Sequence, residues 1–272
     1  MANKFNIGDL EVIALVDGKT TVDDRYFAGV TLEQWQPHKR WLTHDDKLEL
    51  PFTSFLVRSG DKRVLIDCGL GPIKGSGYEG GALMDDLATT GVKPDEIDVV
   101  FVTHLHVDHI GWGATRDGDS LRVTFPNAAY RWTAAEQEFW SGELPPQQVA
   151  RRDIFATVAP HFEPADGGTT LAPGIDVVAL PGHTPGHAGV ILSSGDERAF
   201  LLGDAIACPV QLEEPEWSGM GDMDPALARR TQEAVAKEIE ERNALATASH
   251  FPGLTFGRIL RGEGKRYWQA IR

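Results

Sequence analysis

Short apolar runs bounded by turn residues recur along the chain, and they predict β-strands. A first strand is expected over residues 5–17, closed by a turn at Gly18. A hairpin is expected from the apolar runs 52–58 and 63–67, which flank the polar turn 59–62. Further strands are predicted over residues 98–102, 121–123, 129–132, 171–180, 190–192 and 199–202, with a Pro-Gly turn inside the run 171–180.

Helix signals fall between these strands. A helix at about 82–90 is expected to stop at Gly91, and a second begins after Thr133, where Glu136 completes a capping-box pattern. Two more are predicted over about 147–158 and from Pro225 to about Leu245. This order predicts an α/β fold in which two mixed sheets pack face to face with helices outside, as one domain spanning residues 1–272.

Residues 19–50 lack a clean period and carry the aromatic side chains of Phe27, Trp35 and Trp41. So long an irregular segment inside a compact domain is usually functional, which suggests a lid whose aromatic residues contact the substrate. The alternative is that these aromatic residues are anchors, either of the chain's own core or of an arm that packs on a partner subunit in a homodimer.

One stretch stands out chemically. Residues 101–112 place His104, His106, Asp108 and His109 directly after a predicted buried strand. At a spacing of two, His104 and His106 can share one side of a turn and bind one ion, which leaves Asp108 and His109 for a second ion. Imidazole and carboxylate ligands suit zinc, with iron and manganese also admissible. A one-ion site, or a surface cluster without catalysis, is the plainer alternative.

Further candidate ligands stand at predicted strand ends downstream. A Pro/Gly-rich loop holds His183 and His187, of which His183 is nearer its strand and the better ligand candidate, while His187 suits a supporting role. Asp204 ends an apolar strand, where a buried carboxylate needs a partner and its two oxygens can bridge two cations. His250 follows the long C-terminal helix. Without His187, the two sets supply seven ligands, enough for two ions.

The composition of the chain excludes some classes of binding partner. The net charge of −14 argues against binding to a phosphate backbone, so no nucleic-acid partner is expected. The chain has no 18-residue apolar run and no apolar signal segment near Met1, which predicts no membrane span and a cytoplasmic location. Cys68 and Cys208 do not form a disulfide framework and are expected to be small buried thiols near the site.

The ordered motifs resemble those of the metallo-β-lactamase-fold hydrolases. The resemblance rests on His104-Leu105-His106-Val107-Asp108-His109, Gly182-His183-Thr184-Pro185-Gly186-His187, Gly203-Asp204, Ser249-His250 and the earlier Leu65-Ile66-Asp67-Cys68-Gly69. It covers about residues 10–255 and implies a four-layer αβ/βα sandwich.

The resemblance also implies roles for these residues. His104, His106 and His183 would hold a first metal, and Asp108, His109 and His250 a second. Asp204 would bridge the two ions, and Asp67 would orient a ligand histidine. The implied cofactors are two divalent ions, zinc first, with manganese, iron or cobalt as alternatives.

Within the family, the chain looks most like the lactonase and organophosphate-hydrolase branch. The quorum-quenching lactonases of that branch often carry a Tyr a few residues after the bridging Asp, whereas the run 204–208 here has none. Either acyl-homoserine-lactone chemistry is in doubt, or another residue takes that role. Trp112 adjoins the ligand cluster and is expected to line an apolar, uncharged pocket for a small-molecule substrate.

The expected reaction is hydrolysis of a lactone, carboxylic ester or phosphotriester by a hydroxide that bridges two metal ions. Asp204 and Asp108 are the predicted catalytic residues, with Asp108 as a candidate proton carrier. Two alternatives remain open: a single-iron, dioxygenase-like member, and a thioesterase similar to glyoxalase II. The number and kind of bound metal ions separate the first alternative from hydrolysis.

Overall fold

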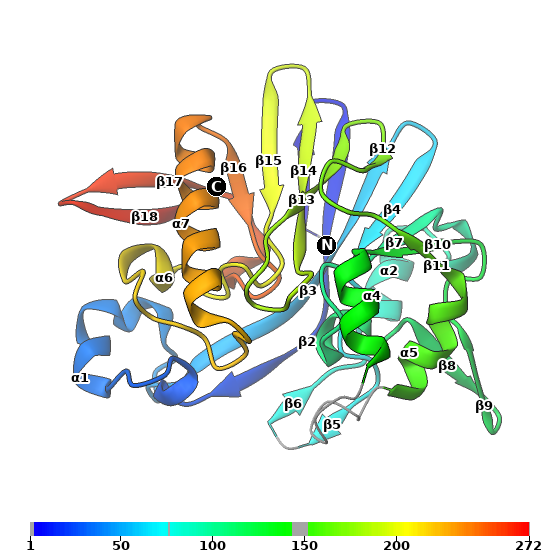
Figure 1. The fold of residues 1–272 in the computed structure, drawn as a ribbon, viewed down its shortest axis with the longest axis horizontal. Helices are drawn as coiled ribbons and strands as arrows, with labels where there is room; N and C mark the ends of the chain where they lie inside the picture. Colours follow the sequence, from blue (N-terminus) through cyan, green and yellow to red (C-terminus); the bar gives the residue numbers. More distant parts are fainter. Residues whose placement is uncertain (1–2, 76, 143–151, 272) are drawn as a thin grey trace.

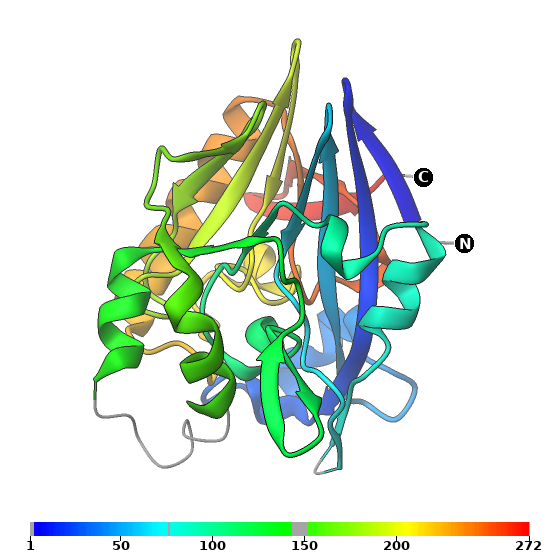
Figure 2. The ribbon, with the colours of Figure 1, turned by 90° about the vertical axis from the view of Figure 1, so that its right-hand side faces the viewer.

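Two mixed β-sheets pack against each other, with helices on their outer sides (Figures 1 and 2). The structure is a computed structural model that describes residues 3–75, 77–142 and 152–271. Within these residues the N-terminal sheet has nine strands in the order β11-β10-β7-β4-β3-β2-β6-β5, with β1 paired to β2. The C-terminal sheet has seven, in the order β12 to β18.

The N-terminal sheet comprises β1 Asn3–Ile7, β2 Leu10–Val22, β3 Leu48–Ser59, β4 Lys62–Ile66, β5 Lys74–Gly75, β6 Tyr78–Glu79, β7 Val99–Phe101, β10 Ala129–Trp132 and β11 Phe162–Pro164. A separate ribbon is formed by β8 Ala114–Asp117 and β9 Ser120–Val123. The C-terminal sheet comprises β12 Thr170–Ala172, β13 Ile175–Ala179, β14 Ala188–Ser194, β15 Glu197–Leu201, β16 Leu245–Thr247, β17 Gly257–Gly262 and β18 Lys265–Ala270.

Helices cover the outer faces of both sheets, as Figure 2 shows for α2 Leu83–Thr89 and α7 Pro225–Glu241. The short helices are α1 Leu32–Trp35, α3 Val107–Ile110, α4 Ala134–Ser141, α5 Arg152–Val158 and α6 Val210–Glu213. The 3₁₀ turns are η1 Asp24–Tyr26, η2 Gln36–Trp41, η3 Pro94–Glu96, η5 Ala159–His161 and η6 Pro252–Leu254.

The hydrophobic core follows the alternation of the strands. On β2, Val12 and Ala14 face the other sheet and pack with residues such as Val190, whereas Ile13 and Leu15 face outward toward α2. A third cluster joins the outer face of the C-terminal sheet to α7. These apolar layers confirm the predicted four-layer αβ/βα sandwich.

Several predicted boundaries are corrected. The first strand is in fact a hairpin of β1 and β2 that turns at Gly8, and β2 continues to Val22 because it pairs with the whole length of β3. The last long helix ends at Glu241, because the chain turns at Asn243 (φ +49°) and enters β16. The sequence patterns also missed the β17–β18 hairpin. Part of the helix expected over 147–158 lies outside the described residues; the described part is α5.

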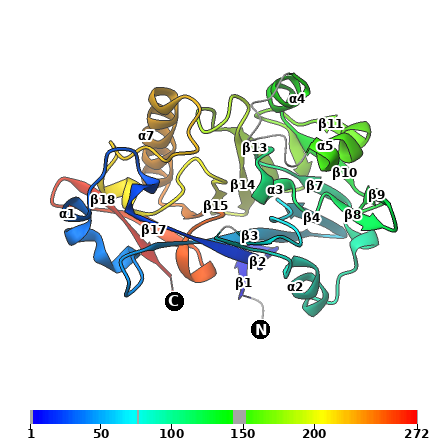
Figure 3. The same cartoon turned by 90° about the horizontal axis from the view of Figure 1, so that it is seen from below.

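The segment expected to be irregular over residues 19–50 is shorter than predicted, since β2 and β3 take both its ends. Its middle, residues 23–47, packs against the same chain beside α6 and β18 (Figure 3). Phe27 and Trp35 are fully buried with Trp217, and their rings pack at 5.6 and 4.8 Å from it. These two side chains therefore form a small core with Trp217.

None of the helices in the described ranges is both long and apolar enough to cross a lipid bilayer.

Candidate metal centre

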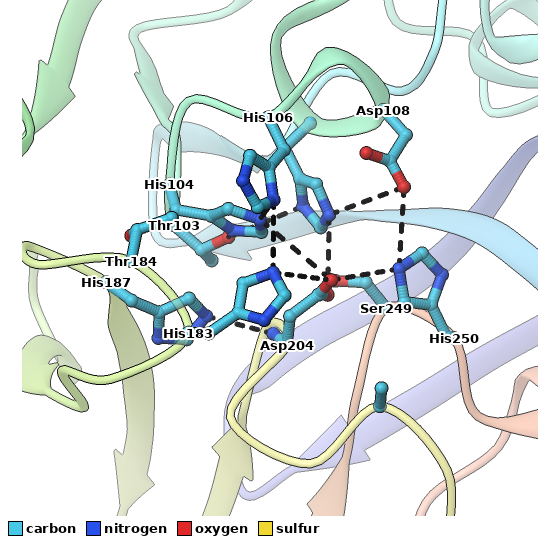
Figure 4. Close-up of polar contacts among 12 residues, drawn as sticks. Thr103, His104, His106, Asp108, His183, Thr184, His187, Asp204, Ser249 and His250 are labelled. Atoms are coloured by element: carbon cyan, nitrogen blue, oxygen red, sulfur yellow. Dashed lines mark hydrogen bonds and ion pairs between the residues drawn. The ribbon is translucent and has the colours of Figure 1, made fainter. Parts of the chain in front are cut away.

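The candidate ligands meet at one edge of the sandwich because each follows the C-terminal end of a strand. His104 and His106 follow β7, and His183, Asp204 and His250 follow β13, β15 and β16. The strands β13, β15 and β16 run in the same direction in the second sheet. Figure 4 shows these side chains pointing into one space between the two sheets.

Three imidazoles form a first cluster. Nδ1 of His106 lies 3.0 Å from Nε2 of His104 and 3.0 Å from Nε2 of His183. Burial, followed by the neighbouring imidazoles, lowers the pKa of His104 and His106 well below the usual range, so both rings stay neutral. Three ring nitrogens that converge on one point supply the donor set that zinc takes in its catalytic sites.

A second cluster holds Asp108, His109 and His250. Oδ2 of Asp108 lies 3.5 Å from Nε2 of His250 and 3.8 Å from Nε2 of His109. These separations exceed ordinary hydrogen bonds but suit atoms that share one cation. The carboxylate and two imidazoles come from two different sheets, so only the folded chain assembles them.

Asp204 lies between the clusters. Its Oδ1 is 3.3 Å from Nε2 of His109, and its Oδ2 is 3.1 Å from Nε2 of His250 and 3.5 Å from Nε2 of His183. One carboxylate thus contacts both donor sets, as the sequence analysis expected of a bridging residue.

The carboxylate charges of the centre, and its buried polar atoms without hydrogen-bond partners, fit a site for two cations. In the described parts of the chain, Nε2 of His109 and Oδ1 of Asp204 are buried without a hydrogen-bond partner, although they face each other. Burial opposes protonation of His250, but Asp204 and Asp108 raise its pKa to about 9. Burial likewise opposes protonation of His109, and nearby carboxylates raise its pKa. The carboxylates around these two imidazoles therefore concentrate negative charge, which bound cations would balance.

Three ligand imidazoles are oriented by hydrogen bonds at Nδ1, the ring nitrogen that faces away from the clusters. Oδ2 of Asp67 lies 2.8 Å from Nδ1 of His109, the contact expected of a residue that orients a ligand histidine. Nδ1 of His250 lies 2.7 Å from the carbonyl oxygen of Pro51. Asp222, which the sequence patterns did not single out, places Oδ1 at 3.0 Å from Nδ1 of His183.

His187 supports the centre without pointing its donor atoms at a cluster. Its Nε2 accepts the backbone N–H of Asp204 at 2.9 Å, so its Nδ1 carries the proton and donates to the carbonyl of Leu180 at 3.1 Å. Burial lowers the pKa of this imidazole to about 3. This placement agrees with the supporting role expected for His187.

The other two predicted pocket aromatics, Trp112 and Trp41, are partly buried, and each donates a hydrogen bond to a carboxylate. The indole N–H of Trp112 donates to Asp17 at 2.8 Å, and its ring packs against the core between the first sheet and its helices. Trp41 donates to Glu213 on α6 at 3.2 Å. Both indoles are therefore bound to buried carboxylates of the scaffold.

Tyr26 is a residue that sequence reasoning missed. A Cβ added at Gly219 would lie 3.6 Å from its Oη, and Gly219 neighbours the Asp222 that holds His183. Burial and the charges of Asp204 and Asp222 raise the pKa of the phenol well above its usual value, so it remains a neutral donor. No spacing signal links Tyr26 to the ligand motifs, because its segment reaches the loop beside His183 through backbone hydrogen bonds with Ser218 and Met220, which lie far along the sequence.

Comparison with known families agrees with this geometry. Residues 50–250 match the model of the metallo-beta-lactamase superfamily, and the chain belongs to that superfamily. The relatives are hydrolases, which confirms the expected class, a metal-dependent hydrolase. An N-acyl homoserine lactonase from Bacillus sp is 25% identical over 243 residues, which is 80% of this chain and 90% of the relative.

Solved structures give the same picture. The hydrolase AbOPH of the beta lactamase superfamily superposes with a TM-score of 0.86 at 27% identity, over 100% of this chain and 97% of that one. AidC, a dizinc quorum-quenching lactonase in complex with a product, N-hexnoyl-L-homoserine, gives a TM-score of 0.89 at 25% identity over the same shares. The chain is thus similar to lactonases and to a further hydrolase of one superfamily.

Proposed function

We propose that the protein is a dinuclear metal-dependent hydrolase that opens lactones or cleaves related esters. The observation that carries this proposal is the position of Asp204, whose carboxylate faces both sets of ring nitrogens: Oδ2 lies near His183 and His250, and Oδ1 lies near His109. A single-metal site needs no such shared carboxylate. The lactonases among the relatives point to the same bond type.

The residues divide the work between holding ions and handling protons. His104, His106 and His183 would hold one ion, and Asp108, His109 and His250 the other, with Asp204 between them. Such a pair of divalent ions, zinc being the first choice, supplies an activated water as nucleophile and an electrophile for the substrate oxygen.

Asp108 is the most accessible carboxylate of the centre. Its side chain is 17% exposed, against 5% for Asp204. This access suits a group that passes a proton toward the leaving oxygen, the role proposed for Asp108. The phenol of Tyr26 is a neutral donor on the side of His183 and is proposed to bind the substrate oxygen.

Two exposed apolar side chains flank the centre and favour an apolar substrate. Tyr78 stacks on Phe52 at 6.1 Å, and Phe52 packs edge-on against His250 at 5.9 Å. Met220, 65% exposed, precedes Gly221, whose added Cβ would lie 2.6 Å from the His183 ring. The proposed substrate is a lactone or ester with an apolar acyl or aryl group that lies along these side chains.

The test combines a metal count with a substrate panel. The protein as purified is analysed for bound metals and assayed with lactones, aryl esters, phosphotriesters and thioesters. About two zinc, manganese or cobalt ions per chain with lactone or ester hydrolysis supports the proposal. One iron with oxygen uptake supports the dioxygenase-like alternative, and preference for thioesters supports the thioesterase alternative.

Replacing the shared carboxylate tests the dinuclear arrangement itself. Asp204→Asn is expected to lower both metal loading and turnover, because an amide offers one acceptor atom where two are needed. Glu163→Gln, a change at an exposed carboxylate paired with Arg131, is the control and is expected to alter neither. Full activity of Asp204→Asn with two ions retained would contradict the assignment.

A further inference from the structure

Glu136 is a buried carboxylate that the reaction does not use. It lies in the first turn of α4, where its sequence pattern predicted a capping box with Thr133. The structure corrects half of that prediction. The Thr133 hydroxyl does accept the Glu136 backbone N–H at 3.2 Å, but the Glu136 carboxylate turns away to other donors. Its side chain is completely buried.

Four donors converge on this carboxylate. Oε2 accepts the backbone N–H of Leu105 at 3.0 Å and the indole N–H of Trp140 at 2.8 Å. Oε1 accepts the backbone N–H of Gly186 at 3.0 Å and the hydroxyl of Thr184. A carboxylate offers only acceptors, so all four donors are satisfied at once.

These donors come from the loops that carry the first ligand cluster. Leu105 stands between His104 and His106, and Thr184 directly follows His183. The Trp140 ring packs edge-on against His106 at 6.0 Å. One loop follows β7 of the first sheet and the other follows β13 of the second, so a single side chain ties together ligand loops of both sheets.

Gly186 allows the second loop to approach this closely. A Cβ at this position would lie 2.4 Å from the backbone nitrogen of Glu136 and 2.4 Å from Oγ1 of Thr133. The carbonyl of Gly186 also accepts the Thr133 hydroxyl at 2.7 Å. The loop is therefore bonded to the first turn of α4 through both its N–H and its C=O.

The second ligand cluster is held by a different acid. Asp67 contacts Nδ1 of His109 at 2.8 Å and accepts the hydroxyl of Ser249, the neighbour of His250, at 3.3 Å. Within the described residues, the Glu136 carboxylate makes no hydrogen bond to Asp108, His109 or His250. Asp67 also accepts the backbone N–H of Thr103, the neighbour of His104, at 2.8 Å, so it supports the second cluster and one side of the first, whereas the donors to Glu136 belong to the loops of the first cluster and to Trp140 beside it.

We propose that Glu136 is a positioning residue that fixes the geometry of the first cluster, and that it controls the affinity of that site alone. The proposal rests on the proposed dinuclear function. It assigns Glu136 to the first ion, whereas Asp67 holds His109 of the second cluster and also Thr103 beside His104, so that a substitution at Glu136 should weaken one site selectively.

The central variant is Glu136→Gln. An amide placed here must turn its NH₂ group toward at least one fixed donor, either Gly186 N–H or the pair from Leu105 and Trp140. Metal-stripped protein is titrated with Co²⁺ against a chromophoric chelator, which yields a dissociation constant for each equivalent. His106→Ala and His250→Ala, each lacking one ligand of one cluster, assign the two Co²⁺ absorption spectra to sites.

The expected result is a loss of about tenfold to a hundredfold in Co²⁺ affinity at the first site, with the second site unchanged. Asp67→Asn is expected to weaken the second site through His109 and also the first site through Thr103, which lies beside His104. Gln137→Ala is the matched control. Gln137 is the next residue of α4 and accepts the indole N–H of Trp132, but within the described residues its side chain makes no hydrogen bond to either ligand loop. This variant should lower the melting temperature of the metal-free protein and leave both affinities unchanged.

Thr184→Val separates geometry from charge and remains informative if Glu136→Gln fails to fold. It removes one donor and keeps the carboxylate, so a smaller loss at the first site is expected. The proposal is overturned if either variant leaves the first site at wild-type affinity, or if Glu136→Gln weakens both sites equally. Wild-type protein that binds no Co²⁺ would instead overturn the proposed dinuclear function, and the positioning role with it.

Discussion

Replacing Gly186 by alanine tests how tightly the His183 loop must dock on α4. The added Cβ would lie 2.4 Å from the Glu136 nitrogen, 2.4 Å from Thr133 Oγ1 and 2.9 Å from the carbonyl carbon of Ala135. Favourable carbon contacts lie at about 3.5–4.0 Å, so the loop must retreat by roughly 1 Å. The helix backbone cannot yield at this point, because it begins the first turn of α4.

The cost follows from the bonds that such a retreat breaks. The displaced loop loses the Gly186 N–H bond to Glu136 and the Thr133 hydroxyl bond to the Gly186 carbonyl, at 3.0 and 2.7 Å. A buried polar group left without a partner costs about 1–3 kcal/mol. Partial relaxation of the loop brings the expected loss of unfolding free energy to about 3 kcal/mol. For a domain of this size that corresponds to a fall of roughly 6–12 °C in melting temperature.

The assay is thermal unfolding of metal-stripped protein, since bound ions would add their own stabilisation. Gly219→Ala is the control, because its Cβ would make an ordinary 3.6 Å contact with Tyr26 and its φ is not positive. That control should change the stability by less than about 0.5 kcal/mol. If Gly186→Ala unfolds within 2 °C of the wild type, the loop has more room than the structure gives it, and the steric reasoning is refuted.

Two further predictions concern the phenol and the thiols. Tyr26→Phe should lower kcat/KM for a lactone about tenfold with metal content unchanged, because it removes a neutral donor beside the centre; wild-type kinetics would exclude Tyr26 from the reaction. Both cysteines are buried, and burial raises the pKa of Cys208 to about 12 and that of Cys68 well above its usual value. Neither should react with iodoacetamide at pH 8 until the protein unfolds, and rapid native alkylation would show that the sites open.

The sequence predicted the candidate ligands better than the groups that support them. His104, Asp204 and His183 each follow an apolar run that ends a strand, and strand ends of one direction meet at one edge. Asp222 does not follow an apolar run that ends a strand, so no sequence pattern marked it. It lies in a loop between α6 and α7, and it reaches His183 across 39 residues of sequence only because that loop folds back over the ring.

Local patterns also failed where one residue type serves two purposes. Glu136 matches a capping box three residues after Thr133, and helix chemistry alone explains it without any reference to distant loops. The aromatic residues of the arm were similarly ambiguous. Phe27 and Trp35 become a core only through Trp217, which lies 182 residues after Trp35 and shares no repeat with the arm.

Three buried acids solve one physical problem of this centre. Ligand loops are irregular, so their backbone N–H groups have no strand partners and need acceptors away from water. Asp17 accepts four backbone N–H groups of the glycine-rich segment 70–83, besides the indole of Trp112. Asp67 accepts the N–H of Thr103, and Glu136 those of Leu105 and Gly186. The same acceptors concentrate negative charge around the ligands, and this charge is balanced most directly by cations bound between them. The side chains that keep the loops in place thus also favour the ions that the loops are shaped to hold.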